Sequence, residues 1–350
     1  MTEADFSTLI GLVSQYSPSG QERGAVEWLV ARMKAIGYRD TFVDDAGNAV
    51  GIMGDGPKQI VLLGHIDTVP GNINVRVENN ILFGRGSVDA KGPLACFTDA
   101  VAQVGAVDGW QLVVIGAVEE ERNSEGARFV VDQYKPDFAI IGEPNRWDRI
   151  ALGYKGSAWA TVTVKHEQMH TASGEETACE SAIDVWLKIK AYADSFNQDK
   201  HKAFDKLLFT LRGMDSDSND FEQWARLRVG VRLPMDVSPK DWYVKLNGIA
   251  DGATVEPKGF AVPAWECEKN TPLVRAFLNG IRSQGGEPRF VYKTGTADLN
   301  IVAPAWKCPA LVYGPGDSNL DHTPSEHIEL GEYSKAVNVL WEGLKKLTQR

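Results

Sequence analysis

The first 150 residues alternate between short apolar runs and segments with helical periodicity. The apolar runs at 60–63 and 112–115 have the length of buried strands. Gly37 lies where the second of two opening helices is expected to end. This alternation predicts a mostly parallel sheet with helices on both faces. The expected helices are 6–16, 21–37, 92–104 and 124–134, and the expected strands are 59–63, 111–118 and 138–141.

The pattern changes after Gly153 and returns to strand–helix alternation from Pro272. The intervening segment has several half-exposed strands and two helices, which is typical of a small α+β layer with an antiparallel sheet. We therefore expect an α/β fold, with one domain formed by residues 1–153 and 265–350 and an α+β domain inserted at 154–264. The later strands are expected at 159–165, 207–212, 225–233, 253–264, 289–292 and 310–313, and the later helices at 176–196, from 239, at 272–284 and at 331–347.

Histidine and carboxylate side chains follow the predicted strands, where ligand sites of an α/β sheet gather. Asp67 comes two residues after His65, and such a carboxylate can fix the tautomer of a metal-bound imidazole. Taken alone, Asp89 would be assigned the more common role of a helix N-cap, and the glutamate triplet at 119–121 would be assigned to a solvated acidic loop. Nitrogen and oxygen donors without thiolates form the set that zinc or a similar divalent ion takes. The candidate donors in chain order are His65, Asp89, Glu119, Glu120, Glu121, Glu143 and His322.

Charge and composition narrow the class of protein. The net charge of −10 argues against general nucleic-acid binding, although it allows a local basic patch. No apolar run approaches the roughly 20 residues of a membrane span, and the first residues are acidic, unlike a signal peptide. The four cysteines are scattered, as reduced thiols of a cytoplasmic protein are. We expect a cytoplasmic enzyme that binds neither membrane nor nucleic acid.

Five motifs in a fixed order resemble those of the M20 family of co-catalytic zinc peptidases and deacylases. The resemblance covers essentially the whole chain, and it implies a catalytic zinc-peptidase domain with the inserted domain as lid and dimerisation domain of a homodimer. It also implies two divalent metal ions, Zn²⁺ or Co²⁺, with His65 and Glu143 on one ion, Glu121 and His322 on the other, and Asp89 bridging. The motifs are His65-x-Asp67, Arg85-Gly86-x-x-Asp89-x-Lys91-Gly92, Glu120-Glu121, Gly142-Glu143-Pro144 and His322-x-x-x-Glu326.

The resemblance implies that Glu120 is the general base that takes a proton from the metal-bridging water, with Asp67 orienting His65. The family usually shows Asp-Glu-Glu at this place. The ungapped register puts Glu119 on the family's aspartate, whereas a slip of one residue would make Glu119 the base.

Further site residues are implied in the inserted domain and just after it. His170 matches a histidine that reaches a partner subunit's active site and stabilises the oxyanion. Arg232 matches an arginine that binds the substrate carboxylate, although Gly230 replaces the family's usual aspartate. Asn219 matches a lid asparagine, although the residues that follow it depart from the family's usual pattern. Gly295-Thr296 matches a turn that cradles the substrate.

Two segments, 88–94 and 293–300, resemble the branch of this family that releases lysine or ornithine from an amino-group carrier protein in lysine and arginine biosynthesis. The resemblance implies that the carrier is acidic, so this acidic chain would need a local basic surface to bind it. The runs at 200–206 and 226–228 are candidates, and solvated surface charge is the more common role of each. The alternatives are an N-acetyl-ornithine or N-acetyl-lysine deacetylase, a general dipeptidase or carboxypeptidase, and a non-catalytic scaffold of the same fold.

Overall fold

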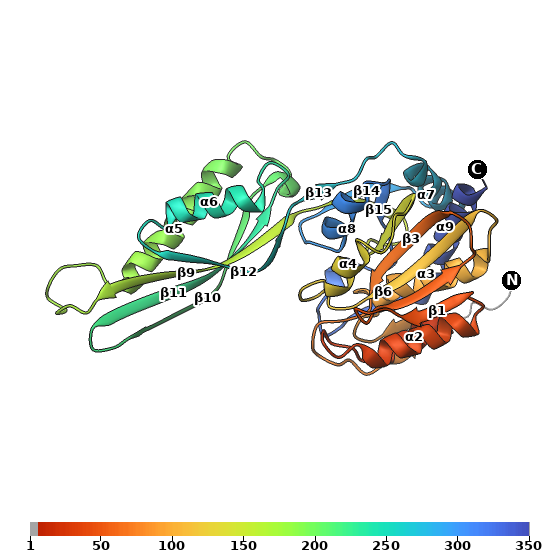
Figure 1. The fold of residues 1–350 in the computed structure, drawn as a ribbon, viewed down its shortest axis with the longest axis horizontal. Coiled ribbons are helices and arrows are strands. Elements are labelled where there is room, and N and C mark those ends of the chain that lie inside the picture. The colour runs from red at the N-terminus through yellow and green to blue at the C-terminus, as the bar shows by residue number, and fades with distance from the viewer. Residues whose placement is uncertain (1–5, 350) are drawn as a thin grey trace. The chain divides into compact units, whose positions relative to one another are not determined.

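The computed structural model describes residues 6–349, which form two compact units (Figure 1). The first unit comprises residues 6–152, 267–292 and 297–349, and the second comprises 153–266 and 293–296. The sequence placed 293–296 with the first domain. The structure places it with the second, where the Lys155 N–H donates to the Lys293 carbonyl at 3.2 Å.

The central sheet of the first unit has a parallel centre and antiparallel margins. The parallel strands, in spatial order, are β6 (Trp110–Ala117), β3 (Lys58–His65), β7 (Phe138–Gly142) and β15 (Ala310–Val312). Antiparallel strands flank them, namely β2 (Ala49–Met53) and β1 (Asp40–Val43) beyond β6, and β8 (Arg149–Tyr154) beyond β15, with β14 (Arg289–Lys293) paired to β8. The α/β class with a mostly parallel centre is therefore confirmed.

Burial explains why the central strands could be predicted and the marginal ones could not. Residues 60–65 of β3 are all buried, because β3 lies between two other strands and beneath helices. β1 is an edge strand with no buried residue, so its sequence carries no apolar alternation. The sequence also missed β2, in which Gly51 interrupts the apolar run because the Met33 side chain occupies the space of a Cβ.

Helices and a small sheet complete the first unit. β3, β6 and β7 contact α3, and α3 contacts α9. The helices are α1 (Ser7–Val13), α2 (Arg23–Ala35), α3 (Lys91–Val104), α4 (Glu125–Val130), α7 (Pro272–Ser283), α8 (Leu299–Trp306) and α9 (Leu330–Thr348), with a 3-10 turn η2 (Ser318–Leu320). The small sheet has the order β16 (His327–Glu329), β5 (Ile81–Phe83) and β4 (Arg76–Glu78).

The second unit is an antiparallel four-stranded sheet with two helices on one of its faces (Figure 1). The strand order is β10 (Leu208–Ser218), β11 (Glu222–Leu233), β9 (Gly156–Glu167) and β12 (Thr254–Val262), with a short β13 (Trp265–Glu266) paired to residues 153–154. The helices are α5 (Ala178–Asn197), α6 (Pro239–Ile249) and the 3-10 turn η1 (Ala203–Asp205). β10 runs six residues beyond its predicted end, because its second half is polar and half-exposed.

Side-chain capping fixes where the helices of the second unit begin. The Thr177 hydroxyl oxygen accepts from the Glu180 N–H, and the Glu180 carboxylate accepts from the Thr177 N–H, so α5 starts at Ala178 rather than at 176.

Within residues 6–349, no helix combines the length and hydropathy that crossing a membrane requires.

Candidate metal centre

The structure brings the five predicted metal ligands together in the first unit. His65 ends β3, Glu121 follows β6 and Glu143 follows β7, so three neighbouring parallel strands deliver them to one edge of the sheet. Asp89 lies in the turn before α3, and His322 follows η2. Three overlapping groups have donor atoms within 4.8 Å of one another, namely His65–Asp89–Glu143, His65–Glu120–Glu121 and Asp89–Glu121–His322.

The Asp89 carboxylate lies between two imidazoles. Its Oδ1 is 3.2 Å from His65 Nε2, and its Oδ2 is 3.0 Å from His322 Nε2. His322 Nε2 also lies 2.8 Å from Glu121 Oε1. Each oxygen of Asp89 thus faces a different histidine, which is the arrangement that a carboxylate shared between two cations requires.

The charges around Asp89 shift its pKa and that of its neighbour. Hydrogen bonds with Asp89 and Glu121 raise the pKa of His322 to about 10. Although burial raises it, the bonds with His322 and His65 hold the pKa of Asp89 well below its usual range.

Carboxylates are concentrated here beyond what the two histidines can neutralise. Burial, with repulsion from nearby carboxylates, raises the pKa of Glu120 and of Glu143 well above the usual value. Burial also raises the pKa of Asp298 to about 6, and Asp298 Oδ1 is buried without a hydrogen-bond partner. Such a group of acids is costly unless cations accompany it, so the donor set fits divalent metal ions. Asp298 lies two residues after Thr296, and the sequence predicted no role for its side chain.

Asp67 connects two of the ligand-bearing loops. Its Oδ1 accepts from the Glu120 N–H at 3.0 Å, and its Oδ2 accepts from the Glu121 N–H at 3.1 Å and from Ser19 Oγ at 2.7 Å. Asp67 Oδ1 also lies 3.3 Å from His65 Nδ1. The sequence suggested the contact between Asp67 and the imidazole, but not the hydrogen bonds that Asp67 accepts from the backbone of Glu120 and Glu121.

The side chains of the three consecutive glutamates do not all have the same neighbours. Glu119 has a positive φ of 59°, and its carboxylate pairs with Arg122 at 3.6 Å. Glu120 shares a donor group with His65 and Glu121. Among the described residues Glu119 belongs to no such group, which favours the register with Glu120 beside the metal ligands.

Glu326 supports the turn that carries Asp89. This fully buried carboxylate accepts from the backbone N–H groups of Val88 and Asp89 at 2.9 and 3.0 Å. Its other oxygen binds Arg85 Nη1 at 2.8 Å. The motif His322-x-x-x-Glu326 was visible in the sequence, but only the fold shows that its glutamate reaches back to Asp89.

The candidate residues of the second unit divide into a connected set and two exposed positions. Arg232 Nη1 donates to Thr296 Oγ1 at 2.6 Å, and Thr296 Oγ1 donates to the Lys155 carbonyl at 3.2 Å. Gly295 lies in the same segment. The Thr296 hydroxyl therefore orients Arg232.

His170 and Asn219 lie on exposed turns. His170 follows β9, and its Nδ1 accepts from the Ala172 N–H at 3.1 Å. Asn219 forms the turn between β10 and β11, where its Oδ1 accepts from the N–H groups of Phe221 and Glu222, each at 2.9 Å. That turn geometry gives Asn219 a local structural role.

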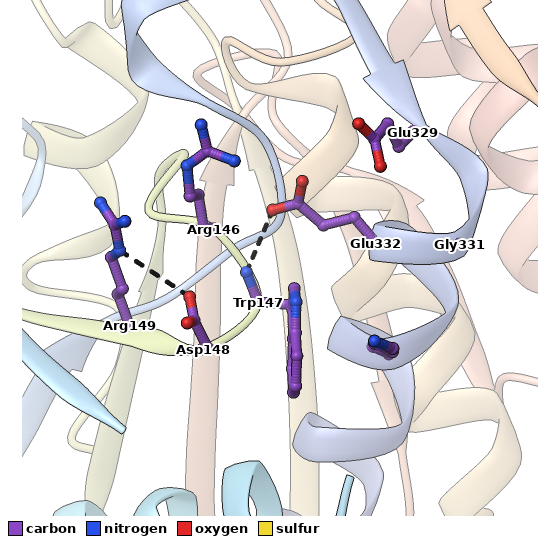
Figure 2. A pocket seen from close by; sticks show the side chains of 8 residues that line it. Arg146, Trp147, Asp148, Arg149, Glu329, Gly331 and Glu332 are labelled. Carbon is purple, nitrogen blue, oxygen red and sulfur yellow. Dashed lines mark hydrogen bonds and ion pairs between the residues drawn. The ribbon is translucent and has the colours of Figure 1, made fainter. Parts of the chain in front are cut away.

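A separate hollow of the first unit contains none of the candidate ligands (Figure 2). Glu332 accepts there from the Trp147 N–H, and Lys335 lies over the Trp147 ring at 4.6 Å from its centroid. Its three cationic and three acidic side chains give it no excess of either charge. The lining residues are Arg146, Trp147, Asp148, Arg149, Glu329, Gly331, Glu332 and Lys335.

Solved structures share the fold over nearly the whole chain. An M20 family metallo-carboxypeptidase from Sulfolobus solfataricus superposes with a TM-score of 0.77 at 17% identity, covering 100% of both chains. A tripeptidase from Staphylococcus aureus superposes with a TM-score of 0.79 at 17% identity, covering 99% of this chain and 98% of the other. These similarities establish the fold.

Sequence relatives are closer. A protein of Deinococcus radiodurans named LysW-lysine hydrolase is 42% identical over 346 residues, covering 96% of this chain and 94% of the relative. A protein of Thermococcus kodakarensis named putative LysW-lysine/LysW-ornithine hydrolase is 41% identical, covering 96% of this chain and 90% of the relative. The profile of peptidase family M20/M25/M40 matches residues 61–346. The chain, a hydrolase, therefore belongs to peptidase family M20/M25/M40.

Proposed function

We propose that this enzyme hydrolyses the amide that joins lysine or ornithine to an amino-group carrier protein, in lysine and arginine biosynthesis. The observation that carries the proposal is the 42% identity, over 96% of the chain, to a relative named for LysW-lysine hydrolysis. The cluster of carboxylates and histidines in the first unit supports it, because metal-assisted amide hydrolysis uses such a donor set with an adjacent base.

His65 and Glu143 would hold one divalent ion, Glu121 and His322 the other, and Asp89 would bridge them. Zinc suits this set of imidazoles and carboxylates, and cobalt is compatible with it. When bound, the two ions would polarise the amide carbonyl and make water more acidic.

Glu120 is the proposed general base. Its carboxylate would accept a proton from the attacking water and then deliver it to the nitrogen of the departing amino acid. The bonds from Asp67 to the backbone of Glu120 and Glu121 support this role, because they fix the loop that carries the base.

Residues of the second unit would bind the substrate. Arg232, oriented by Thr296, would take the carboxylate of the departing amino acid in a charge-assisted bond. His170 would donate to the oxyanion in the active site of a partner subunit, so we further propose a homodimer. Gly295 would let the chain approach the substrate closely, whereas Asn219 would hold the turn between β10 and β11. We also propose that the enzyme is cytoplasmic, as its four free cysteines suggest.

The direct test offers purified enzyme carrier-linked lysine, carrier-linked ornithine, N-acetyl-ornithine and plain dipeptides in parallel. We expect kcat/KM to be highest for the carrier-linked amino acids, and metal analysis to find about two divalent ions per chain. Faster turnover of N-acetyl-ornithine would replace the proposal with a deacetylase, and faster turnover of dipeptides would replace it with a dipeptidase. Light scattering tests the dimer, which a monomeric mass would rule out.

A further inference from the structure

The four-stranded sheet of the second unit has one face without helices. Alternate residues of β9 and β11, such as Val162 and Leu227, share one buried core with residues of α5 and α6. The residues between them point the opposite way, because successive side chains of a strand alternate between the two faces. This face, which we call the open face, carries Trp159 on β9 and Arg226, Arg228 and Arg232 on β11.

A β-bulge adds a fourth arginine to the open face. The register of β10 against β11 shifts between Leu211 and Gly213, leaving Arg212 as the extra residue. The Arg212 guanidinium lies 5.9 Å from the centroid of the Trp159 ring, so its side chain lies over the open face.

Two glycines make room for the large side chains. Gly230 lies opposite Trp159, and a Cβ at Gly230 would come within 2.4 Å of the Trp159 ring. Gly213 lies opposite Arg228, and a Cβ at Gly213 would come within 2.4 Å of the Arg228 guanidinium. Gly230 is the position at which similar enzymes commonly carry aspartate. Here the strand between Arg228 and Arg232 therefore has no carboxylate, and a tryptophan ring occupies the space.

Elsewhere on the open face, cations are paired with acids. Three ion pairs lie at its margins, at 3.4, 3.5 and 2.9 Å, namely Lys165–Glu222, Arg226–Asp215 and Lys258–Glu256. Two further acids of this face remain: Asp217 accepts from the Ser218 N–H, and Glu167 lies opposite Glu222.

Arg212 and Arg228 differ from those marginal cations. Both are exposed, and within residues 6–349 neither side chain forms an ion pair or a hydrogen bond. In a chain of net charge −10, two such guanidinium groups beside Trp159 form a local cationic and aromatic surface.

The other basic run, at 200–206, is a weaker candidate. Lys200 pairs with Asp236 at 2.8 Å, and the Lys206 carbonyl accepts from the buried Lys155 ammonium. Lys200 also lies over the Phe196 ring, 5.2 Å from its centroid, so its ammonium already has local partners.

We propose that Arg212, Arg228 and Trp159 form a docking surface for an acidic segment of the polypeptide that carries the scissile amide. The inference rests on the proposed function, since it assigns a surface to the carrier part of that substrate. Unpaired guanidinium groups can take carboxylates in bidentate bonds, and a flat aromatic ring adds contact area. Arg232 on the same strand would take the carboxylate of the amino acid, so β11 would bind both ends of an acidic substrate.

The test compares two double variants that remove the same charge from the open face. Arg212→Gln/Arg228→Gln removes the unpaired arginines, and Arg226→Gln/Lys258→Gln removes two cations that already have acidic partners. The substrates are carrier-linked lysine and γ-glutamyl-lysine, which contains the same amide without the polypeptide. The ratio to compare is kcat/KM for carrier-linked lysine divided by kcat/KM for γ-glutamyl-lysine. We expect the first variant to lower this ratio about tenfold and to make the ratio less dependent on salt concentration. The second variant should change the ratio less than about threefold.

Binding of a glutamate-rich decapeptide, measured by calorimetry, separates this proposal from the proposed function. If wild-type enzyme leaves carrier-linked lysine intact, the proposed function fails, and weaker decapeptide binding by the first variant would still support the docking surface. An unchanged ratio and unchanged decapeptide binding in the first variant would overturn the docking surface alone. It is also overturned if the first variant loses self-association, or loses affinity for a single-stranded oligonucleotide that the wild type binds.

Discussion

The two units of this protein hold their functional candidates in opposite ways. In the first unit, three of the five proposed metal ligands follow buried strands, and carboxylates such as Asp67 and Glu326 have a partner for each oxygen. In the second unit, Arg212, Arg228 and His170 are exposed on a sheet face or a loop. A preorganised polar site suits chemistry, whereas exposed cations suit recognition of a large charged partner.

Replacing the proposed base tests the first unit most severely. Glu120→Gln should lower kcat about a thousandfold while metal content is retained, because the amide cannot accept a proton from water. Steady-state kinetics with metal analysis measures both. The matched control is Glu119→Gln, whose carboxylate pairs with Arg122 at the surface and whose loss should change kcat less than about threefold. The reverse result would move the base to Glu119.

Removing the metal ions should lower the free energy of unfolding, because the buried acids then lack cations to neutralise them. At metal concentrations about 100 times the Kd, binding should raise the free energy of unfolding by about 3 kcal/mol for each ion. The metal-free protein should also lose stability as the pH rises from 5 to 8. The pKa values of Glu120, Glu143 and Asp298 are raised in the folded state, so folding retains protons that are lost in this range. His322, with its pKa raised to about 10, acts in the same direction.

Thermal unfolding with and without chelator, at both pH values, measures this effect. A metal-free protein that is more stable at pH 8 than at pH 5 would contradict the burial of these acids.

Replacing Glu326, which fixes the turn carrying Asp89, should have an effect of intermediate size on metal affinity. Glu326→Gln removes the charge that holds Arg85 and replaces one acceptor oxygen by an amide, so the turn carrying Asp89 should lose its fixed position. We expect metal affinity to fall about 10- to 100-fold, as for other outer partners of metal ligands. Competition with a chromophoric chelator measures it, and the exposed Glu329→Gln is the control. Equal affinities would make Glu326 a purely structural residue.

In the second unit, Arg232→Lys should raise KM about tenfold with a smaller change in kcat, because an ammonium cannot replace the guanidinium fork. Thr296→Val should have a similar but smaller effect, since it removes only the group that orients Arg232. Steady-state kinetics separates KM from kcat. A fall in kcat alone would assign Arg232 to the chemical step.

The smallest effect is expected at Asn219. Asn219→Ala should lower the free energy of unfolding by about 1 kcal/mol, because two N–H groups of the hairpin turn lose their acceptor. Asn219→Asp keeps the acceptor oxygen and should restore most of that loss, as chemical denaturation can measure. If Asn219→Asp instead lowers kcat/KM without affecting stability, the side chain contacts substrate.

The same contrast explains what the sequence could predict. β3, β6 and β7 are buried on both faces, so their apolar runs predicted both the strands and the position of His65, Glu121 and Glu143 at their ends. The bonds from Glu326 to residues 88 and 89 join positions more than 230 apart in the chain, and no local pattern contains that information.

The bulge at Arg212 was equally invisible in the sequence, because it depends on the register between two strands. For the same reason, the sequence could name the arginines of β11 but not the surface that they form.

The position of His322 has a consequence for synthesis of the chain. His65, Asp89, Glu121 and Glu143 all precede the second unit, whereas His322 follows it. A ribosome therefore makes the four carboxylate and imidazole donors first, then the entire second unit, and only then the last donor. At a synthesis rate of about 5–20 residues per second, His322 is added many seconds after the first four donors. The proposed metal centre can therefore close only after the whole second unit has been synthesised.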